Sequence, residues 1–384
     1  MENSSDRTAA VIPPGSTIGI LGGGQLGRMT ALAAARLGYR SVVYSPEVDS
    51  IAGQVAAGQV EGEYDDKAAL ARFAAQVDVI TYEFENVPER TVAECERYRP
   101  VRPGIAPIHF AQHRLREKAF FRQAGIGTAD YQPVCSEADL AAATALPGIL
   151  KTCTEGYDGK GQARVTTQDG LKAAWDRLGR RECILEALVD FHCEISAIVA
   201  RGLDGTARCF PIGLNDHRDG ILRTTMVPSG LPETVLARAE RLGLQLAESL
   251  GLVGLVALEM FVTRDGRVLA NEMAPRPHNS GHWTIDACGT SQFEQLVRAI
   301  CGLPLGAVDV LAPSRMENLI GEEAGDWLRF MADPTARLHL YGKAKARPGR
   351  KMGHVIYVGN WGALPSTASA HATPPDRPSI SRSA

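Results

Sequence analysis

The sequence predicts a mixed fold, in which an α/β domain at the N-terminus is followed by an α+β region. The first part alternates short apolar runs with helical patterns up to about residue 110, which is typical of a parallel sheet with crossover helices. Strands dominate the second part, up to about residue 310, with helical patterns between them. The 384 residues are enough for two or three domains of roughly 150 residues each.

Each element is predicted from its own pattern. The apolar run Thr17–Leu21 is typical of a buried strand, and Gly38 ends the helical pattern that follows it. Gly125 likewise ends a helical pattern that starts at His109. Strands of the first part are expected at 17–21, 39–44 and 77–82, and helices of the chain at 28–37, 65–76, 109–124, 136–145, 168–178, 231–250 and 291–301.

The composition is that of a folded, globular protein. Hydrophobic residues make up 45% of the chain and charged residues 22%, and the net charge is −3. This charge argues against a protein that binds nucleic acid through bulk electrostatics. The chain has no apolar run near the roughly 18 residues of a membrane helix, and residues 1–15 lack the pattern of an export signal. We therefore expect a cytoplasmic protein with reduced cysteines that binds neither nucleic acid nor a membrane.

A glycine turn follows the first expected strand. Gly22, Gly24 and Gly27 have the spacing G-x-G-x-x-G directly before a helical pattern, so backbone N–H groups could face an anion there. Three interpretations stay open: a dinucleotide site, a site for another phosphate ligand, and a tight turn with a structural role. The second expected strand ends at Tyr44 without the acid typical of nicotinamide-binding proteins, which favours another phosphate ligand.

A second glycine-rich loop occupies the tip of an expected hairpin. Lys151 ends the strand before it and would supply a fixed positive charge, while the backbone donors of the loop fold over a polyphosphate. A flexible surface hairpin is the alternative. The loop residues are Gly156, Tyr157, Asp158, Gly159, Lys160, Gly161 and Gln162.

Two glutamates are expected to face each other across a hairpin. The segment 253–273 is expected to form two strands joined by a two-residue turn at Asp265-Gly266, which pairs Glu259 with Glu272. Directly opposed side chains have Cβ atoms about 4.5–5.5 Å apart. Two like charges in an apolar run destabilise a sheet unless they are neutralised, and carboxylates suit Mg²⁺. The alternatives are a proton shared by the two acids, or an ion pair with Arg276.

The glycine-rich loop, the strand lysine and the paired acids together indicate a site for a nucleoside triphosphate. Two more acids fit around it. Glu186 lies at the end of an apolar strand, whose exposed backbone suits adenine, and Glu194 follows closely, where a carboxylate suits ribose hydroxyls. Either glutamate alone could also be a solvated strand residue.

These segments resemble the ATP-grasp superfamily and, within it, the 5-(carboxyamino)imidazole ribonucleotide synthase family of purine biosynthesis, also known as the phosphoribosylaminoimidazole carboxylase ATPase subunit. The glycine-rich loop alone would indicate only the superfamily, whereas the segment Pro275–Thr284 is much more specific for the family. The matching segments follow the order of the family and lie at 22–29, 156–162, 219–224, 271–284 and 347–354.

The resemblance implies a fold in three ordered parts. A Rossmann-like pre-ATP-grasp domain is expected at 1–112, and an ATP-grasp domain at 113–310 with a lid subdomain at about 126–188. A small, β-rich C-terminal domain is expected at 311–362. The tail 363–384 is rich in Pro and Ser and is expected to be disordered.

The resemblance also implies a reaction and its cofactors. ATP would phosphorylate bicarbonate to carboxyphosphate, and the exocyclic amine of 5-aminoimidazole ribonucleotide would attack either this species or CO2 released from it in the closed site. ATP and Mg²⁺ are the expected cofactors, with the metal held by Glu259 and Glu272. Both substrates are small molecules, and family members are typically homodimers.

Specific residues carry these expected roles by resemblance. Arg276, His278 and Lys351 would handle bicarbonate and the imidazole substrate, although His278 and the nearby His282 could instead make structural hydrogen bonds. The expected ATP contacts are Arg114, Lys151, the loop 156–162, Glu186, Ala187, Leu188, Val189, Glu194, His217, Asn271 and Glu272. The expected ribonucleotide contacts are Gly24, Gln25, Leu26, Glu83, Asp158 and Arg350.

Three other functions remain as alternatives at this point. The first is a formate-using glycinamide ribonucleotide transformylase of the same superfamily. The second is a nucleotide-dependent dehydrogenase built on the first glycine turn. The third is a non-enzymatic nucleotide-binding protein, against which the acidic pair and the lysines argue.

Overall fold

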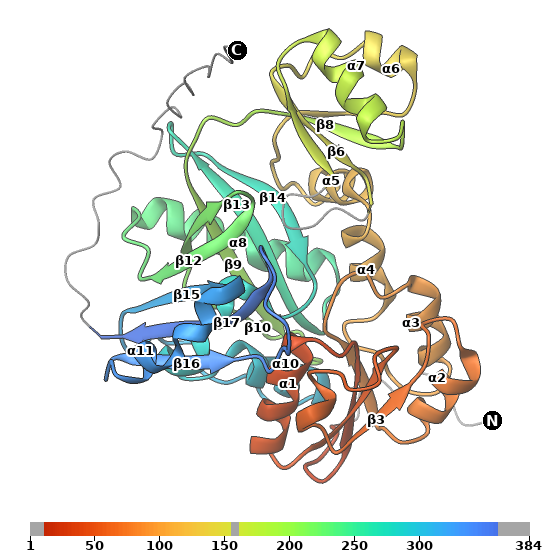
Figure 1. Cartoon of the computed structure of the whole chain (residues 1–384), viewed down its shortest axis with the longest axis vertical. Coiled ribbons are helices and arrows are strands. Elements are labelled where there is room, and N and C mark those ends of the chain that lie inside the picture. Colours follow the sequence, from red (N-terminus) through yellow and green to blue (C-terminus); the bar gives the residue numbers. More distant parts are fainter. Residues whose placement is uncertain (1–10, 155–160, 360–384) are drawn as a thin grey trace, which may run out of the picture.

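The computed structural model describes residues 11–154 and 161–359 (Figure 1). Within these residues the strands form three sheets, with four strands at the N-terminus, four in a small second sheet and nine in a large central sheet. The small sheet, with α6 and α7, stands apart from the N-terminal domain at the opposite end of the molecule (Figure 1). The tail 363–384, expected to be disordered, lies outside the described residues.

The N-terminal domain contains the predicted parallel sheet. Its strands lie in the order β3-β2-β1-β4, and every pair is parallel. Ile18 and Ile20 are fully buried, because helices cover both faces of a sheet of this kind. The elements are β1 (Thr17–Leu21), α1 (Gln25–Arg36), β2 (Arg40–Ser45), the 3₁₀ helix η1 (Gly53–Val55), β3 (Gly58–Glu61), α2 (Lys67–Ala74), β4 (Val79–Tyr82) and α3 (Glu89–Glu96).

The single helix expected at 109–124 is wrong, because two helices occupy this region: α4 (Ile105–Ala111) and α5 (Arg114–Gln123). The chain is extended at His113, and the side chain of His113 accepts a hydrogen bond from the Arg116 N–H at the start of α5. The predicted stop at Gly125 is confirmed, since this glycine has a φ of 71°, in the left-handed region.

The small sheet has the strand order β5-β8-β6-β7, and its Leu150 packs in one core with Leu140 of α6 and with Leu171 and Trp175 of α7. The predicted hairpin is confirmed, because β6 and β7 are antiparallel and Lys151 pairs with Gln162. Residues 155–160 at its tip lie outside the described residues. The elements are β5 (Tyr131–Val134), α6 (Glu137–Ala141), β6 (Gly148–Thr152), β7 (Gln162–Val165), α7 (Gln168–Arg177) and β8 (Cys183–Ala187).

The central sheet has the strand order β14-β13-β9-β11-β12-β15-β17-β16, with β10 paired to β9. The first of its elements are β9 (Phe191–Arg201), β10 (Ala207–Cys209), β11 (Gly213–Arg218), β12 (Ile221–Val227), α8 (Glu233–Ser249), β13 (Gly254–Thr263) and β14 (Val268–Ala274). They continue as η2 (Asn279–Gly281), α9 (Thr284–Ala287), α10 (Gln292–Cys301), β15 (Ser314–Ile320), η3 (Gly321–Asp326), α11 (Trp327–Met331), β16 (Ala336–Leu340) and β17 (Lys351–Val358). The C-terminal strands therefore extend the central sheet, because β15 pairs with β12.

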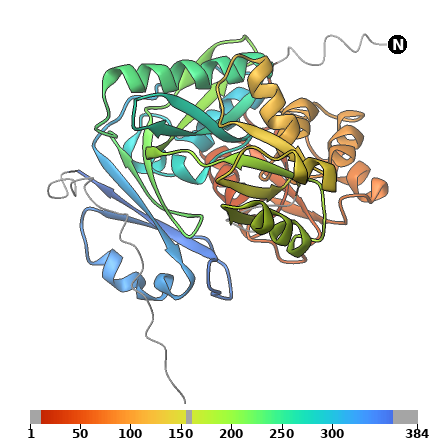
Figure 2. The same ribbon diagram turned by 90° about the horizontal axis from the view of Figure 1, so that it is seen from above.

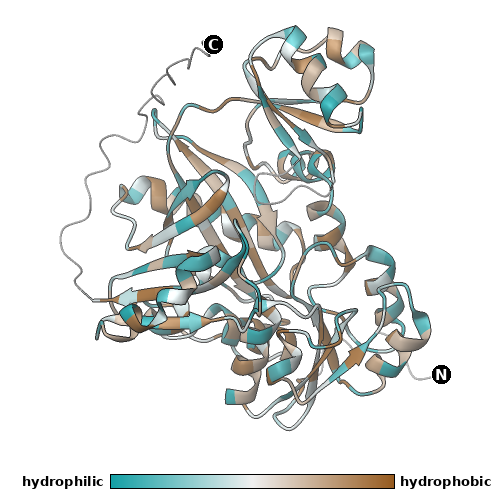
Figure 3. Cartoon of the chain, viewed as in Figure 1, coloured by the Kyte–Doolittle hydropathy of each residue, from teal (hydrophilic) through white to brown (hydrophobic). Residues whose placement is uncertain are grey.

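Helices cover parts of both faces of the central sheet. Ala197 and Val199 of β9 pack with Leu246 of α8, whereas Ile198 and Ala200 pack with residues of α10. Figure 2 shows α8 lying along one side of the sheet, and Figure 3 shows apolar residues along the central strands. The alternation of side chains along a strand thus divides the core into two layers.

The β13–β14 hairpin differs from the expected two-residue turn. Thr263 N–H donates to the Arg267 carbonyl at 2.9 Å, so the loop has three residues and ends at Gly266, whose φ is 81°. Val262 accordingly pairs with Val268, one position away from the expected register. A bulge between Met260 and Glu259 shifts the register by one residue, and the expected pairing is restored beyond it.

Across residues 11–154 and 161–359 the structure contains no helix that is long and apolar enough to cross a membrane.

A substitution at Leu246 tests how much the packing of α8 on the central sheet contributes to stability. This side chain is fully buried against the sheet. Leu246→Ala should lower the free energy of unfolding by about 2–5 kcal/mol, because it leaves a cavity in the core. Leu328→Ala, at a side chain that is mostly exposed, is the control and should change it by less than about 0.5 kcal/mol. Equal stability of the two variants in denaturant titrations would contradict this account of the core.

Candidate active site

The paired glutamates lie directly opposite each other, Glu259 on β13 and Glu272 on β14. The side chain of Glu259 is 13% exposed, and burial and the charge of Glu272 raise its pKa to about 7. Burial also opposes ionisation of Glu272, but Arg114 and Lys151 hold its pKa below the ordinary value. Arg114 Nη1 lies 3.2 Å from Glu272 Oε2. The pair therefore holds one firm negative charge and a second that an added cation would stabilise.

A buried ion cluster lies beside this pair. Glu186 Oε2 is 3.2 Å from Lys151 Nζ and 3.4 Å from Lys118 Nζ, and the three side chains are almost completely buried. Burial raises the pKa of Glu186, but the two lysines outweigh it and hold this pKa below the ordinary value. Lys118 Nζ also donates to the Asn271 carbonyl at 2.6 Å. Asn271 is the extra residue of the β14 bulge, so the bulge frees this carbonyl from the strand ladder.

Glu194 and His217 extend the same side of the sheet. His217 Nδ1 lies 2.8 Å from Glu194 Oε2, and the two side chains are partly buried. Although burial lowers the pKa of His217, the bond to Glu194 and the charge of Glu259 raise it above its ordinary value. Glu194 pairs across the sheet with Phe261, which is two residues from Glu259 and therefore shares its face.

His278 and Arg276 follow β14 and lie against the acidic pair. His278 Nε2 is 3.4 Å from Glu259 Oε1. Burial, with the charges of Arg276 and Lys351, lowers the pKa of His278 well below its ordinary value. Arg276 forms an ion pair with Glu85 of the N-terminal domain, so this contact joins the two domains at the site.

Lys351 is the first residue of β17, and Arg350 directly precedes it. The charge of Lys351 acts on Glu85, Glu259 and His278, so Lys351 lies in the same electrostatic environment. Arg350 Nη1 instead donates to the Lys345 carbonyl at 2.8 Å, in the loop that precedes β17.

The first glycine turn is occupied by a side chain of the protein itself. Glu83 accepts hydrogen bonds from the N–H groups of Gly24 and Gly27, the latter at 2.8 Å. Gln25 and Leu26 begin α1 between these two donors. Burial raises the pKa of Glu83, and these backbone donors oppose the shift. An anionic ligand at this turn would therefore compete with the Glu83 carboxylate for its donors.

The remaining expected ATP contacts lie at strand ends of the small sheet. Ala187 ends β8, Leu188 N–H donates to the Pro147 carbonyl at 3.0 Å, and Val189 follows. Gly161 and Gln162 lie at the start of β7. The expected contacts Gly156, Tyr157, Asp158, Gly159 and Lys160 lie outside the described residues.

The donor set of the glutamate pair fits Mg²⁺. Mg²⁺ is usually held by one or two carboxylates together with substrate phosphates, and these two carboxylates are opposed while one is poorly neutralised by the protein. The group of three potential metal ligands found among the described residues is a different one, formed by His113, Cys153 and Glu182.

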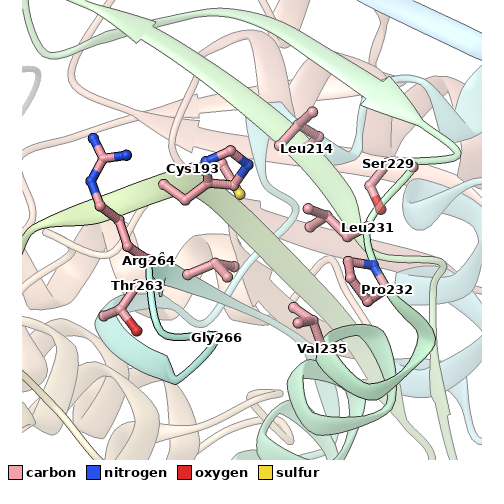
Figure 4. Close-up of a pocket in the computed structure, with 12 residues that line it drawn as sticks. Cys193, Leu214, Ser229, Leu231, Pro232, Val235, Thr263, Arg264 and Gly266 are labelled. Carbon is pink, nitrogen blue, oxygen red and sulfur yellow. The ribbon is translucent and has the colours of Figure 1, made fainter. Parts of the chain in front are cut away.

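A pocket of about 320 Å³ lies on the other face of the central sheet (Figure 4). Cys193, Leu214 and Val235 line it, together with the hairpin loop at Arg264. Cys193 directly precedes Glu194, so its side chain points to the face opposite the acidic pair. This pocket is therefore separate from the candidate active site.

Sequence reasoning missed Lys118 and Glu85. Lys118 follows Arg114 by four residues on α5, a spacing that puts two cations on one face of a helix and could have indicated it. Glu85 follows Glu83 by two residues, but its contact with Arg276 joins positions 191 residues apart and has no local signal.

The fold and this site define a protein of the ATP-grasp class. The family model of the ATP-grasp domain matches residues 119–293, and that of the ribonucleotide synthetase preATP-grasp domain matches residues 16–112. The model of the phosphoribosylaminoimidazole carboxylase C-terminal domain matches residues 314–363.

Curated relatives narrow this class to one family. The N5-carboxyaminoimidazole ribonucleotide synthases of Brucella melitensis and Bacillus subtilis are 46% and 42% identical to the chain, over 92% and 91% of it and 98% and 93% of their own lengths. The chain is also 46% identical to a bifunctional purine synthesis protein of Dictyostelium discoideum, of which it spans 37%. The chain belongs to the N5-carboxyaminoimidazole ribonucleotide synthase family.

Solved structures agree with this assignment. An ADP complex of an N5-carboxyaminoimidazole ribonucleotide synthetase superposes with a TM-score of 0.88 at 43% identity, covering 91% of this chain and 94% of that one. A synthase of Aspergillus clavatus in complex with ADP and 5-aminoimidazole ribonucleotide superposes with a TM-score of 0.84 at 29% identity, covering 92% and 94%.

The buried ion cluster predicts a stability role for Lys118. Lys118→Met should lower the free energy of unfolding by about 3 kcal/mol, because it removes a buried partner of Glu186 and leaves the Asn271 carbonyl unpaired. Lys172→Met, at an exposed position of α7, is the matched control and should stay within about 0.5 kcal/mol of the parent protein. A Lys118 variant as stable as its control in denaturant titrations would contradict the cluster.

Proposed function

We propose that the protein is an ATP-dependent carbon–nitrogen ligase that carboxylates 5-aminoimidazole ribonucleotide with bicarbonate in purine biosynthesis. The observation that carries this proposal is the opposed pair Glu259 and Glu272, held beside Arg114, Lys151 and the buried Glu186. This arrangement suits a metal-bound triphosphate, and the family to which the chain belongs supports the substrate.

The reaction has two steps. In the first, a bicarbonate oxygen attacks the γ-phosphorus of ATP, the bond to the ADP oxygen breaks, and carboxyphosphate and ADP form. In the second, the exocyclic amine attacks the carboxyl carbon, a C–N bond forms, the C–O bond to phosphate breaks, and the amine loses one proton. Carboxyphosphate hydrolyses readily, so the reaction requires a site from which water is excluded.

The cationic side chains are proposed to bind and orient the nucleotide. Arg114 and Lys151 face Glu272 and Glu186, and Lys118 adds a third positive charge, so the cluster keeps a net positive charge toward which a triphosphate is attracted. Glu194, next to His217, is available for hydroxyl groups of the ribose. Glu186 is engaged by two lysines and is proposed to hold them in position.

Glu259 and Glu272 are proposed to hold Mg²⁺. When bound, the metal neutralises charge on the transferred phosphoryl group. The raised pKa of Glu259 fits this role, because the protein itself leaves the second negative charge of the pair poorly compensated.

Arg276, His278 and Lys351 are proposed to handle bicarbonate and the carboxyl group derived from it. Arg276 and Lys351 supply positive charge, and neutral His278 supplies a polar group next to Glu259. The ribonucleotide is proposed to bind near the first glycine turn, where Glu83 faces the charge of Arg276. By resemblance to the family, we also propose a homodimer that works in the cytoplasm.

A phosphate-release assay tests the reaction directly. ATP, bicarbonate and 5-aminoimidazole ribonucleotide are supplied together and then with one omitted at a time. We expect full release only with all three present, and none when formate and glycinamide ribonucleotide replace the two carboxylation substrates. Release with formate and glycinamide ribonucleotide would instead identify a transformylase.

Glu272→Gln should abolish turnover of Mg-ATP, because the amide keeps the shape of the side chain but removes the firm negative charge of the pair. The melting temperature should stay close to that of the parent protein. Glu248→Gln, at an exposed position of α8, is the control and should keep full activity. Normal turnover by the Glu272 variant would exclude the proposed metal site.

Lys351→Ala should slow carboxylation by about 10²-fold, the usual loss when one charged donor is removed from a reacting centre. Because Lys351 is not among the proposed nucleotide contacts, the KM for ATP should change by less than about threefold. Lys345→Ala, at an exposed position of the preceding loop, serves as the control. An unchanged carboxylation rate in the Lys351 variant would assign this residue a structural role.

A further inference from the structure

A buried serine lies next to the acidic pair on the same face of the central sheet. Glu259 pairs with Glu272 on one side and with Ser196 of β9 on the other. Directly paired residues share a face, so the three polar side chains form a row across three strands. Ser196 is 2% exposed and stands in an otherwise apolar stretch of β9, so its hydroxyl needs a partner within the protein.

That partner is Ser280 of η2. Ser196 Oγ lies 2.7 Å from Ser280 Oγ, and Ser280 Oγ lies 2.8 Å from His278 Nδ1. Ser280 is 1% exposed. His278 Nε2 points back to Glu259 Oε1, so the four residues close a ring of contacts that begins and ends on the sheet.

The contacts of Nδ1 decide where the proton of the imidazole lies. Besides the hydroxyl, the backbone N–H of Ser280 points at His278 Nδ1 from 3.4 Å. A backbone N–H can only donate, so Nδ1 must present its lone pair, and the proton of the ring lies on Nε2. With Nδ1 accepting, the Ser280 hydroxyl is free to donate to it while it accepts from Ser196.

The backbone of His278 is also fixed, so the ring stays in this place. Its N–H donates to Gln292 Oε1 at 2.8 Å, and its carbonyl accepts from Gln292 Nε2 at 2.8 Å. The next residue, Asn279, exchanges side-chain hydrogen bonds with Asn318 of β15. The loop is thereby tied to α10 and to the C-terminal part of the sheet.

We infer that Ser196 and Ser280 are positioning residues that hold His278 as an Nε2–H hydrogen-bond donor, directed at the acidic pair and at the oxygens that react beside it. This inference rests on the proposed function for the identity of those oxygens, which belong to the carboxyl group derived from bicarbonate. His278 in this tautomer cannot take a proton through Nε2, so the proton of the attacking amine leaves by another route.

The tautomer is tested without any activity measurement. The protein is labelled with ¹⁵N-histidine, and His278 is assigned by comparison with His278→Gln. We expect the parent protein to show the Nε2–H tautomer, and Ser280→Ala to weaken this preference, because only the backbone N–H of residue 280 then remains at Nδ1. Ser314→Ala is the matched control, because Ser314 is fully buried on β15 and its hydroxyl has no hydrogen-bond partner among the described residues. An Nδ1–H tautomer in the parent protein overturns the inference, whether or not the variants fold.

Steady-state kinetics of the serine variants distinguish residues that position His278 from residues that only stabilise the fold. Ser280→Ala should lower the kcat of carboxylation by about 10–100-fold, the range for partners that orient a histidine, with the KM for ATP changed less than about threefold. Ser196→Ala should act in the same direction but less strongly, and Ser280→Cys should recover part of the rate. Unchanged kcat in Ser280→Ala overturns the inference. A parent protein with the expected tautomer but no carboxylation contradicts the proposed function instead.

Discussion

The whole site depends on two like charges that the central sheet forces together. Glu259 and Glu272 are opposed on neighbouring strands, and such a pair is unfavourable unless positive charge surrounds it. The protein supplies this charge unevenly, since Arg114 and Lys151 compensate Glu272 far better than Glu259 is compensated. Because of this difference, Glu272 stays ionised, whereas the ionised form of Glu259 would be stabilised by an added cation.

Each part of the fold around the acidic pair contributes a charged side chain to the site. Helix α5 carries Arg114, the small sheet carries Lys151, and the N-terminal domain reaches the site through the ion pair of Glu85 with Arg276. The central sheet continues into the C-terminal strands, where β17 begins at Lys351. The domains are therefore joined at the place where the charges meet.

Local patterns predicted β1, β2, β4, α1 and α2 of the N-terminal domain, because each depends on its own periodicity, whereas the short β3 and α3 were not predicted. The pairing of the two acids was predicted correctly, although the predicted two-residue turn was wrong. The loop has one residue more than expected, and the bulge at Asn271 restores the register before Glu272. The contact of Ser196 with the site could not be predicted in this way. It depends on the pairing of β9 with β13, strands far apart in sequence, and no local pattern fixes that register.

The bulge at Asn271 has a consequence for how the hairpin can vary between related proteins. The loop takes Arg264 out of the strand ladder on one side and the bulge takes Asn271 out on the other, so Glu272 stays across from Glu259. Deleting Asn271 would place Glu272 directly after Ala270 and so keep it across from Glu259, but it would remove the carbonyl that Lys118 binds. The bulge residue is therefore constrained by the lysine that binds its carbonyl, whereas substitutions at the exposed loop tip are far less constrained.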